Sequence, residues 1–101
     1  MKKIINGKLF NTETAKCIGC YQYSYPGDFH YCREALYRKR SGEYFLHGEG
    51  GPNSIYQKDL GSNQWSGGES ISPMSADEAK EWAEENLDAD DYIAEFGEPE
   101  E

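Results

Sequence analysis

Three cysteines and a histidine lie close together in the first third of the chain and are residue types that bind zinc. Cys17 and Cys20 have a separation acceptable for a structural zinc site. However, an odd separation within one strand predicts that they lie on opposite faces. His30 and Cys32 share a face and would join the pair if a turn intervened. Metal binding stays open, and we expect three reduced thiols and no cofactor.

Two other motifs resemble ligand-binding sequences but lack essential positions. Asp88–Asp91 has the acids of a calcium loop, but Tyr92 stands where the next oxygen ligand is needed. Gly48–Gly51 resembles a dinucleotide-binding loop, but Asn53 replaces its third glycine. Neither histidine has an obvious nucleophile beside it in the sequence. The sequence therefore predicts a protein that is not an enzyme.

A run of acidic residues near the C-terminus is the most informative pattern. Its members are Asp77, Glu78, Glu81, Glu84, Glu85 and Asp88. On a helical wheel they lie away from Ala79, Trp82 and Ala83. Residues 77–88 rise about 18 Å as a helix, so the carboxylates recur about every 3 Å, against about 3.4 Å for phosphates along a nucleic-acid strand. The run therefore predicts a mimic of a phosphate backbone, and the alternative is a solvated helix face.

We expect this acidic face to contact a partner, because neighbouring like charges slightly destabilise a helix and Lys80 is the one base among them. Asp91 and Trp65 complete the predicted partner-binding residues. Trp65 lies in a long Gly-rich connection over residues 48–69, and such loops are usually functional or mobile.

Charge is divided unevenly along the chain. Residues 1–50 hold 8 basic and 5 acidic side chains, whereas residues 51–101 hold 2 and 14, a net charge of −12. The second half therefore disfavours direct binding to nucleic acid and suits a basic protein partner. The alternative is an RNA- or DNA-binding module built on the Tyr-rich sheet and a basic hairpin. Its residues are Tyr31, Arg33, Tyr37, Arg38, Lys39, Arg40 and Tyr44. These basic residues could equally lie at the tip of a hairpin, or form ion pairs with the acidic half of the chain.

Length and composition indicate one small folded unit. The 101 residues contain 14 aromatic side chains, which we expect to replace the missing valines in the core. The predicted organisation is a single α+β domain over residues 1–97 with an acidic tail over 98–101. No apolar run is long enough for a membrane span, and the start lacks the apolar stretch of a signal peptide. We therefore expect a cytoplasmic protein.

The elements that must position these residues are predicted to be an antiparallel meander of about four to five strands. Asn6-Gly7 predicts a tight hairpin turn, and Gly42 predicts a second hairpin. The expected strands lie within residues 3–10, 15–25, 29–39, 43–47 and 69–72. A short helix is expected over 53–60.

One or two C-terminal helices follow the strands. Ser75 and Glu78 form a capping-box pattern, and Asp88 begins a second helix that Gly97 ends. We expect Trp82, Ile93 and Phe96 to pack these helices on the sheet. The predicted fold class is therefore α+β.

Four segments resemble a family of small proteins carried on plasmids, phages and conjugative elements of Firmicutes. They are residues 2–15, 44–52, 63–68 and 75–82, and the resemblance spans nearly the whole chain. Some small acidic proteins of this kind are type II-A anti-CRISPR proteins, which inhibit the RNA-guided Cas nuclease. The family pattern implies no catalytic or cysteine motif and no site residues.

Composition and resemblance together lead to one expectation. We expect a non-enzymatic inhibitor that binds the type II Cas nuclease, or another basic nucleic-acid-handling protein, in the bacterial cytoplasm. Such nucleases hold guide and target in positively charged channels, which an acidic helix could occupy to block guide RNA loading or DNA recognition. A third possibility is a mobile-element adaptor that uses the Gly-rich loop and Trp65 as its contact surface.

Overall fold

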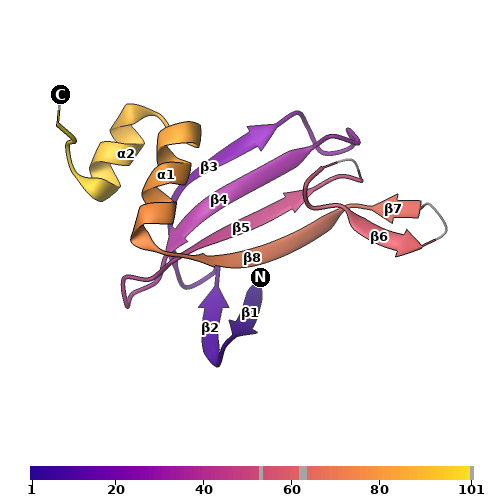
Figure 1. The fold of residues 1–101 in the computed structure, drawn as a ribbon, viewed down its shortest axis with the longest axis horizontal. Coiled ribbons are helices and arrows are strands. Elements are labelled where there is room, and N and C mark those ends of the chain that lie inside the picture. The colour runs from indigo at the N-terminus through magenta and orange to yellow at the C-terminus, as the bar shows by residue number, and fades with distance from the viewer. Residues whose placement is uncertain (53, 62–63, 101) are drawn as a thin grey trace.

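The computed structural model describes residues 1–52, 54–61 and 64–100, and leaves the side chains of 59–66 outside the description. Its elements run in the order β1 (Lys2–Ile5), β2 (Lys8–Asn11), β3 (Lys16–Tyr23), β4 (Cys32–Arg38), β5 (Tyr44–Gly50), β6 (Lys58–Gly61), β7 (Gln64–Ser66), β8 (Gly68–Met74), α1 (Ala76–Asn86) and α2 (Ala89–Phe96). Figure 1 shows both helices at one end of a long sheet and the β6–β7 hairpin at the other.

The central sheet has four antiparallel strands in the order β3-β4-β5-β8. Leu36 of β4 is opposite Leu46 of β5, which is opposite Ser72 of β8. The β1–β2 and β6–β7 hairpins are separate two-stranded sheets. The predicted α+β class, with an antiparallel meander and two C-terminal helices, is therefore confirmed.

The two predicted hairpin turns are confirmed by their backbone angles. Asn6 and Gly7 both have positive φ, at 52° and 77°, as a tight turn between right-twisted strands requires. Gly42 has φ of 93° between β4 and β5. These positions need residues that tolerate the left-handed region, which Asn and Gly do.

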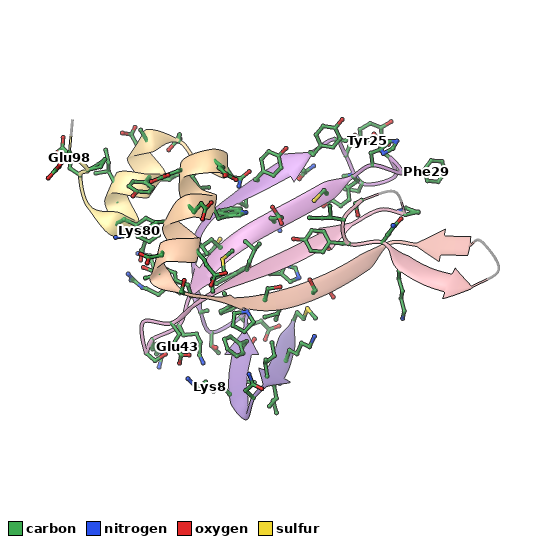
Figure 2. The ribbon with its side chains drawn as sticks, viewed as in Figure 1. Lys8, Tyr25, Phe29, Glu43, Lys80 and Glu98 are labelled. Carbon is green, nitrogen blue, oxygen red and sulfur yellow. The ribbon has the colours of Figure 1, made fainter. Side chains whose placement is uncertain are left out.

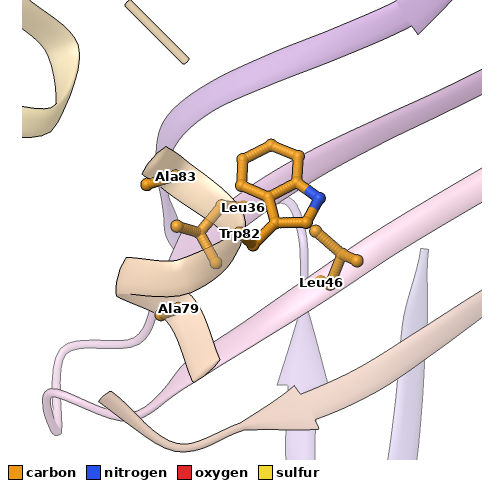
Figure 3. Close-up of a cluster of buried hydrophobic side chains, with 5 residues drawn as sticks. All are labelled: Leu36, Leu46, Ala79, Trp82 and Ala83. Carbon is orange, nitrogen blue, oxygen red and sulfur yellow. The ribbon is translucent and has the colours of Figure 1, made fainter. Parts of the chain in front are cut away.

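The first core cluster lies between the helices and the sheet (Figure 3). Leu36 and Leu46 of the sheet pack with Ala79, Trp82 and Ala83 of α1. The small alanines allow α1 to approach the strands closely, while the Trp82 ring fills the space beside them. This packing directs the opposite side of α1 to solvent.

A second cluster lies on the other face of the sheet. Phe10 of the N-terminal hairpin packs with Phe45 and Ile71, and Phe10 and Phe45 meet edge to face at 5.5 Å. Tyr37 stacks on Phe45 at 5.2 Å. Aromatic side chains therefore supply much of the core, as the missing valines predict.

Not every aromatic residue is in the core, which corrects the expectation that the aromatic side chains replace the missing valines there. Tyr23, Tyr25 and Phe29 are 56%, 65% and 66% exposed. Figure 2 places Tyr25 and Phe29 at the end of the sheet remote from the helices. Asp28 braces the connection between β3 and β4, since its side chain accepts hydrogen bonds from the Ser24 hydroxyl and the His30 amide.

The prediction of a helix over residues 53–60 is wrong. Asn53 lies outside the described residues, but Lys58–Gly61 form β6, which pairs with β7. Ile55, which precedes β6, is 80% exposed. Ile93 was also expected in the core, but it is 38% exposed, whereas Phe96 packs against the first cluster.

Candidate partner-binding surface

Local signals define the start of α1. Ser75 accepts a hydrogen bond from the Glu78 amide at 3.1 Å, and the Glu78 carboxylate accepts one from the Ser75 amide at 3.0 Å. This is the predicted capping box. The backbone amide of Ser75 lowers the pKa of Glu78, because its hydrogen bond favours the ionised carboxylate.

The buried side of α1 determines where its acids point. Five predicted contact residues are exposed on α1: Asp77, Glu78, Glu81, Glu84 and Glu85. At 3.6 residues per turn they cover an arc of about 120°, opposite the buried Ala79, Trp82 and Ala83. Among the described residues no ion pair within 4 Å engages any of the five. From Asp77 to Glu85 the helix rises about 12 Å, so the five carboxylates average one per about 3 Å of helix axis.

Asp88 caps a second helix, as the sequence predicted, so the acidic run over residues 77–88 is not one continuous helix. Leu87 ends α1 with extended backbone, and Asp88 is the N-cap of α2, where its carboxylate accepts a hydrogen bond from the Asp91 amide at 2.9 Å. Asp88, Asp90 and Asp91 are exposed. The acidic surface (Asp77, Glu78, Glu81, Glu84, Glu85, Asp88, Asp90 and Asp91) thus spans two helices.

Glu95 is excluded from the acidic surface because it docks α2 on the sheet. Its carboxylate is 3% exposed and accepts hydrogen bonds from Arg38 at 2.6 Å and from the Tyr44 hydroxyl at 2.7 Å. Burial and the bond to Glu95 raise the pKa of Tyr44. One base of the predicted basic hairpin therefore pairs with the acidic half of the chain.

Glu34 ties α1 to the sheet. Its carboxylate accepts hydrogen bonds from Trp82 Nε1 at 3.1 Å and from the Tyr56 hydroxyl. The Tyr56 ring lies over Gly48, where an added Cβ would meet Cζ of the ring at 2.0 Å. These contacts hold α1, and with it the acidic surface, in one orientation.

Trp65 is not part of the acidic surface. It belongs to β7, at the opposite end of the sheet from the helices (Figure 1), and its side chain lies outside the description. The seven residues of β8 separate the two ends by about 20 Å. Five of the predicted acids thus share one face of α1, and Asp88 follows at the start of α2. Asp91 lines a hollow with Lys16 and Ile18 of β3, and Trp65 lies at the other end of the sheet.

The cysteines are arranged differently from the sequence expectation. A register shift between Cys17 and Gly19 places Cys17 opposite Tyr37 and Cys20 opposite Ala35, so both thiols share the face away from the helices. Cys32 alternates with Glu34 and Leu36 onto the other face. The described residues contain no group of three or more His, Cys, Asp or Glu able to hold a metal ion.

The tyrosines of the nucleic-acid alternative have partners within the fold. Tyr31 donates to Glu49 at 3.1 Å, Tyr37 stacks on Phe45, and Tyr44 donates to Glu95. Lys39 lies 4.3 Å over the Phe10 ring and pairs with Glu43. Lys8 also pairs with Glu43, as Figure 2 shows.

One feature near the acidic surface was missed in the sequence. An open hollow lies between α1 and α2, lined by Ala83, Glu84, Leu87, Asp88, Ala89, Tyr92, Ile93 and Pro99. Its sequence signal is Ile93, an apolar residue in a strongly acidic segment, together with Pro99 in the predicted tail.

Comparisons with protein-family models, with curated proteins and with solved structures find no match to this chain. No helix among the described residues has the length and apolar character needed to cross a membrane.

Proposed function

We propose that this protein is a non-enzymatic inhibitor that binds a basic, nucleic-acid-handling protein through the acidic surface. The observation that carries the proposal is the group of five exposed carboxylates on one face of α1. Their average density along the axis is close to that of phosphates along a strand, and no ion pair among the described residues engages them. A groove that binds a nucleic-acid strand presents lysine and arginine side chains to the phosphates. The acidic surface therefore offers such a groove a rigid substitute for the strand.

The proposed partner is the type II Cas nuclease in the bacterial cytoplasm. This choice rests on the family resemblance together with the charge. The nuclease holds its guide RNA and target DNA in positively charged channels. An inhibitor seated in one of them blocks guide loading if it binds the empty nuclease, and DNA recognition if it binds the loaded one.

Direct nucleic-acid binding is the less favoured function. Arg38, Lys39, Tyr37 and Tyr44 are engaged inside the fold, and Tyr23 and Tyr25 lie near the opposite end of β3 and β4 from the basic turn. Much of the aromatic and basic set of that hypothesis is therefore engaged within the fold.

Co-purification with a type II Cas nuclease, with and without guide RNA, tests the proposal, followed by a DNA cleavage assay. We expect a stable complex in at least one state and loss of cleavage. Absence of a complex in both states, with full cleavage, would contradict the proposed partner. A gel shift with single-stranded RNA is the parallel control, for which we expect no binding.

A further inference from the structure

The hollow between α1 and α2 combines an apolar lining with an acidic rim. Leu87, Tyr92, Ile93 and Pro99 supply apolar walls, and no lysine or arginine is among its lining residues. Glu84 and Asp88 stand at its edge, and both are exposed. Its volume of about 280 Å³ is slightly below the range of small-molecule sites and suits one or two side chains.

Two contacts hold α2 in place beside the hollow. Tyr92 packs against Phe96 at 5.1 Å, and Glu95, buried against Arg38 and Tyr44, fixes α2 on the sheet. Ile93, one turn before Gly97, is therefore left 38% exposed at the surface. The C-terminal tail already contributes Pro99 to the wall.

The surrounding charge selects the occupant. Glu85 of α1 and Asp90 of α2 add exposed carboxylates on the two helices that form the hollow. Asp91 lies on the side of α2 toward Lys16 and Ile18 of β3. The field around the hollow repels phosphates and anionic lipid surfaces and attracts cations. An apolar floor cannot satisfy a bare ammonium or guanidinium group, so it requires an apolar side chain.

We propose that the hollow is a docking site for an apolar side chain carried on a Lys- and Arg-rich segment of a partner protein. The apolar side chain enters between α1 and α2 while its basic neighbours meet the rim carboxylates, in the manner of a helix or loop seated in a groove. This inference rests on the proposed function, because it adds an apolar anchor to the same acidic surface. An apolar anchor would distinguish such a protein partner from ligands that bind the acidic surface through charge alone.

Two short synthetic peptides test the inference without requiring the nuclease. Both consist of Lys, Arg and Ala, and one has a central Leu where the other has Ala. We expect the Leu peptide to bind about tenfold more tightly, since burying a Leu side chain is worth that much or more. Both affinities should fall between about 50 mM and 300 mM salt, but their ratio should persist, because salt screens charges and not apolar contacts.

Substitutions of two isoleucines locate the site. Ile93→Ser should bring the ratio of the two affinities close to one. Ile55→Ser is the matched control, because Ile55 is 80% exposed and lies outside the helices. Ile93→Gln is a second variant that retains helix propensity, and circular dichroism verifies the fold of each.

The outcomes separate this inference from the proposed function. Equal binding of both peptides, or a ratio that survives in both Ile93 variants, overturns the docking site and leaves the acidic surface in place. Binding of neither peptide contradicts the docking site and also removes support for an acidic surface that recognises basic protein segments.

Discussion

Glu34 shows how one side chain organises several segments of this protein. Its two oxygens accept hydrogen bonds from Trp82 of α1 and from Tyr56 in the segment before β6. Strand alternation in the sequence assigns Glu34 to the same face as Leu36, which the structure confirms. Its partners, 22 and 48 residues away, were not predictable, because nothing local specifies such contacts.

Removing the indole donor tests the importance of this contact. Trp82→Phe keeps an aromatic ring but leaves one Glu34 oxygen without its partner, so we expect the free energy of unfolding to fall by about 1–3 kcal/mol. Urea unfolding measures the change. Tyr25→Phe is the control, because Tyr25 is exposed and should stay within about 0.5 kcal/mol of the parent. Equal stability of Trp82→Phe and the parent would contradict this role.

Tyr56 gives the protein a predicted alkaline sensitivity. Burial, followed by the hydrogen bond to Glu34, raises the pKa of Tyr56 above that of a free tyrosine. The stabilisation is therefore fully present below about pH 10 and is lost as the pH rises above it. Tyr56→Phe should lose less stability than the parent between pH 9 and pH 11 in urea unfolding. A parallel loss in both proteins would show that Tyr56 is not responsible.

At the scale of elements, local signals were the most informative. Ser75, Asp88 and Gly97 predicted the limits of both helices, because caps depend on contacts within three or four residues. The helix expected over 53–60 does not form, because Lys58–Gly61 pair with β7 as strand β6. Tyr56, expected inside that helix, packs instead on Gly48 of β5.

The bulge in β3 could likewise not be predicted from the sequence. Strict alternation placed Cys17 and Cys20 on opposite faces, but the register shift at Ile18 brings them to one face. Leu87 lies so close to Gly19 that an added Cβ would be 2.7 Å from it. A contact with a residue that distant in sequence was not predictable from the residues around β3.

The capping box at the start of α1 should make a measurable contribution to the free energy of unfolding. Ser75→Ala removes the acceptor for the Glu78 amide, so we expect about 1 kcal/mol less stability in urea unfolding. Ser72→Ala, an exposed serine in β8, is the control and should change little. If both variants behave alike, the capping box does not contribute to the fold.

For the whole molecule, the net charge of −9 conceals two regions of opposite sign. Exposed carboxylates cover α1 and α2 at one end, where Figure 2 also places Lys80 and Glu98. Basic side chains lie on the N-terminal hairpin and near the β4–β5 turn, where Arg38 pairs with Glu95. The sequence predicted this division, the acidic face and the role of Asp88 as a cap. The direction of the second helix and the hollow required the fold.

The acidic surface can be tested without disturbing the caps. Glu81→Lys with Glu85→Lys reverses two exposed charges on the acidic face of α1. Each replacement changes the net charge by +2, so the double variant has a net charge of −5 instead of −9. Glu13→Lys with Thr14→Lys and Gln57→Lys reaches the same −5 at exposed positions away from the helices. The two variants therefore separate the position of charge from its amount.

The most direct measurement is the affinity of the parent and these two variants for a type II Cas nuclease, in the guide-free and guide-loaded states. We predict that Glu81→Lys with Glu85→Lys weakens binding about a hundredfold or more, because like charges would face each other in the complex. The control variant should stay within about threefold of the parent. Equal affinities for the parent and the helix variant would contradict the proposal that the acidic surface binds this partner.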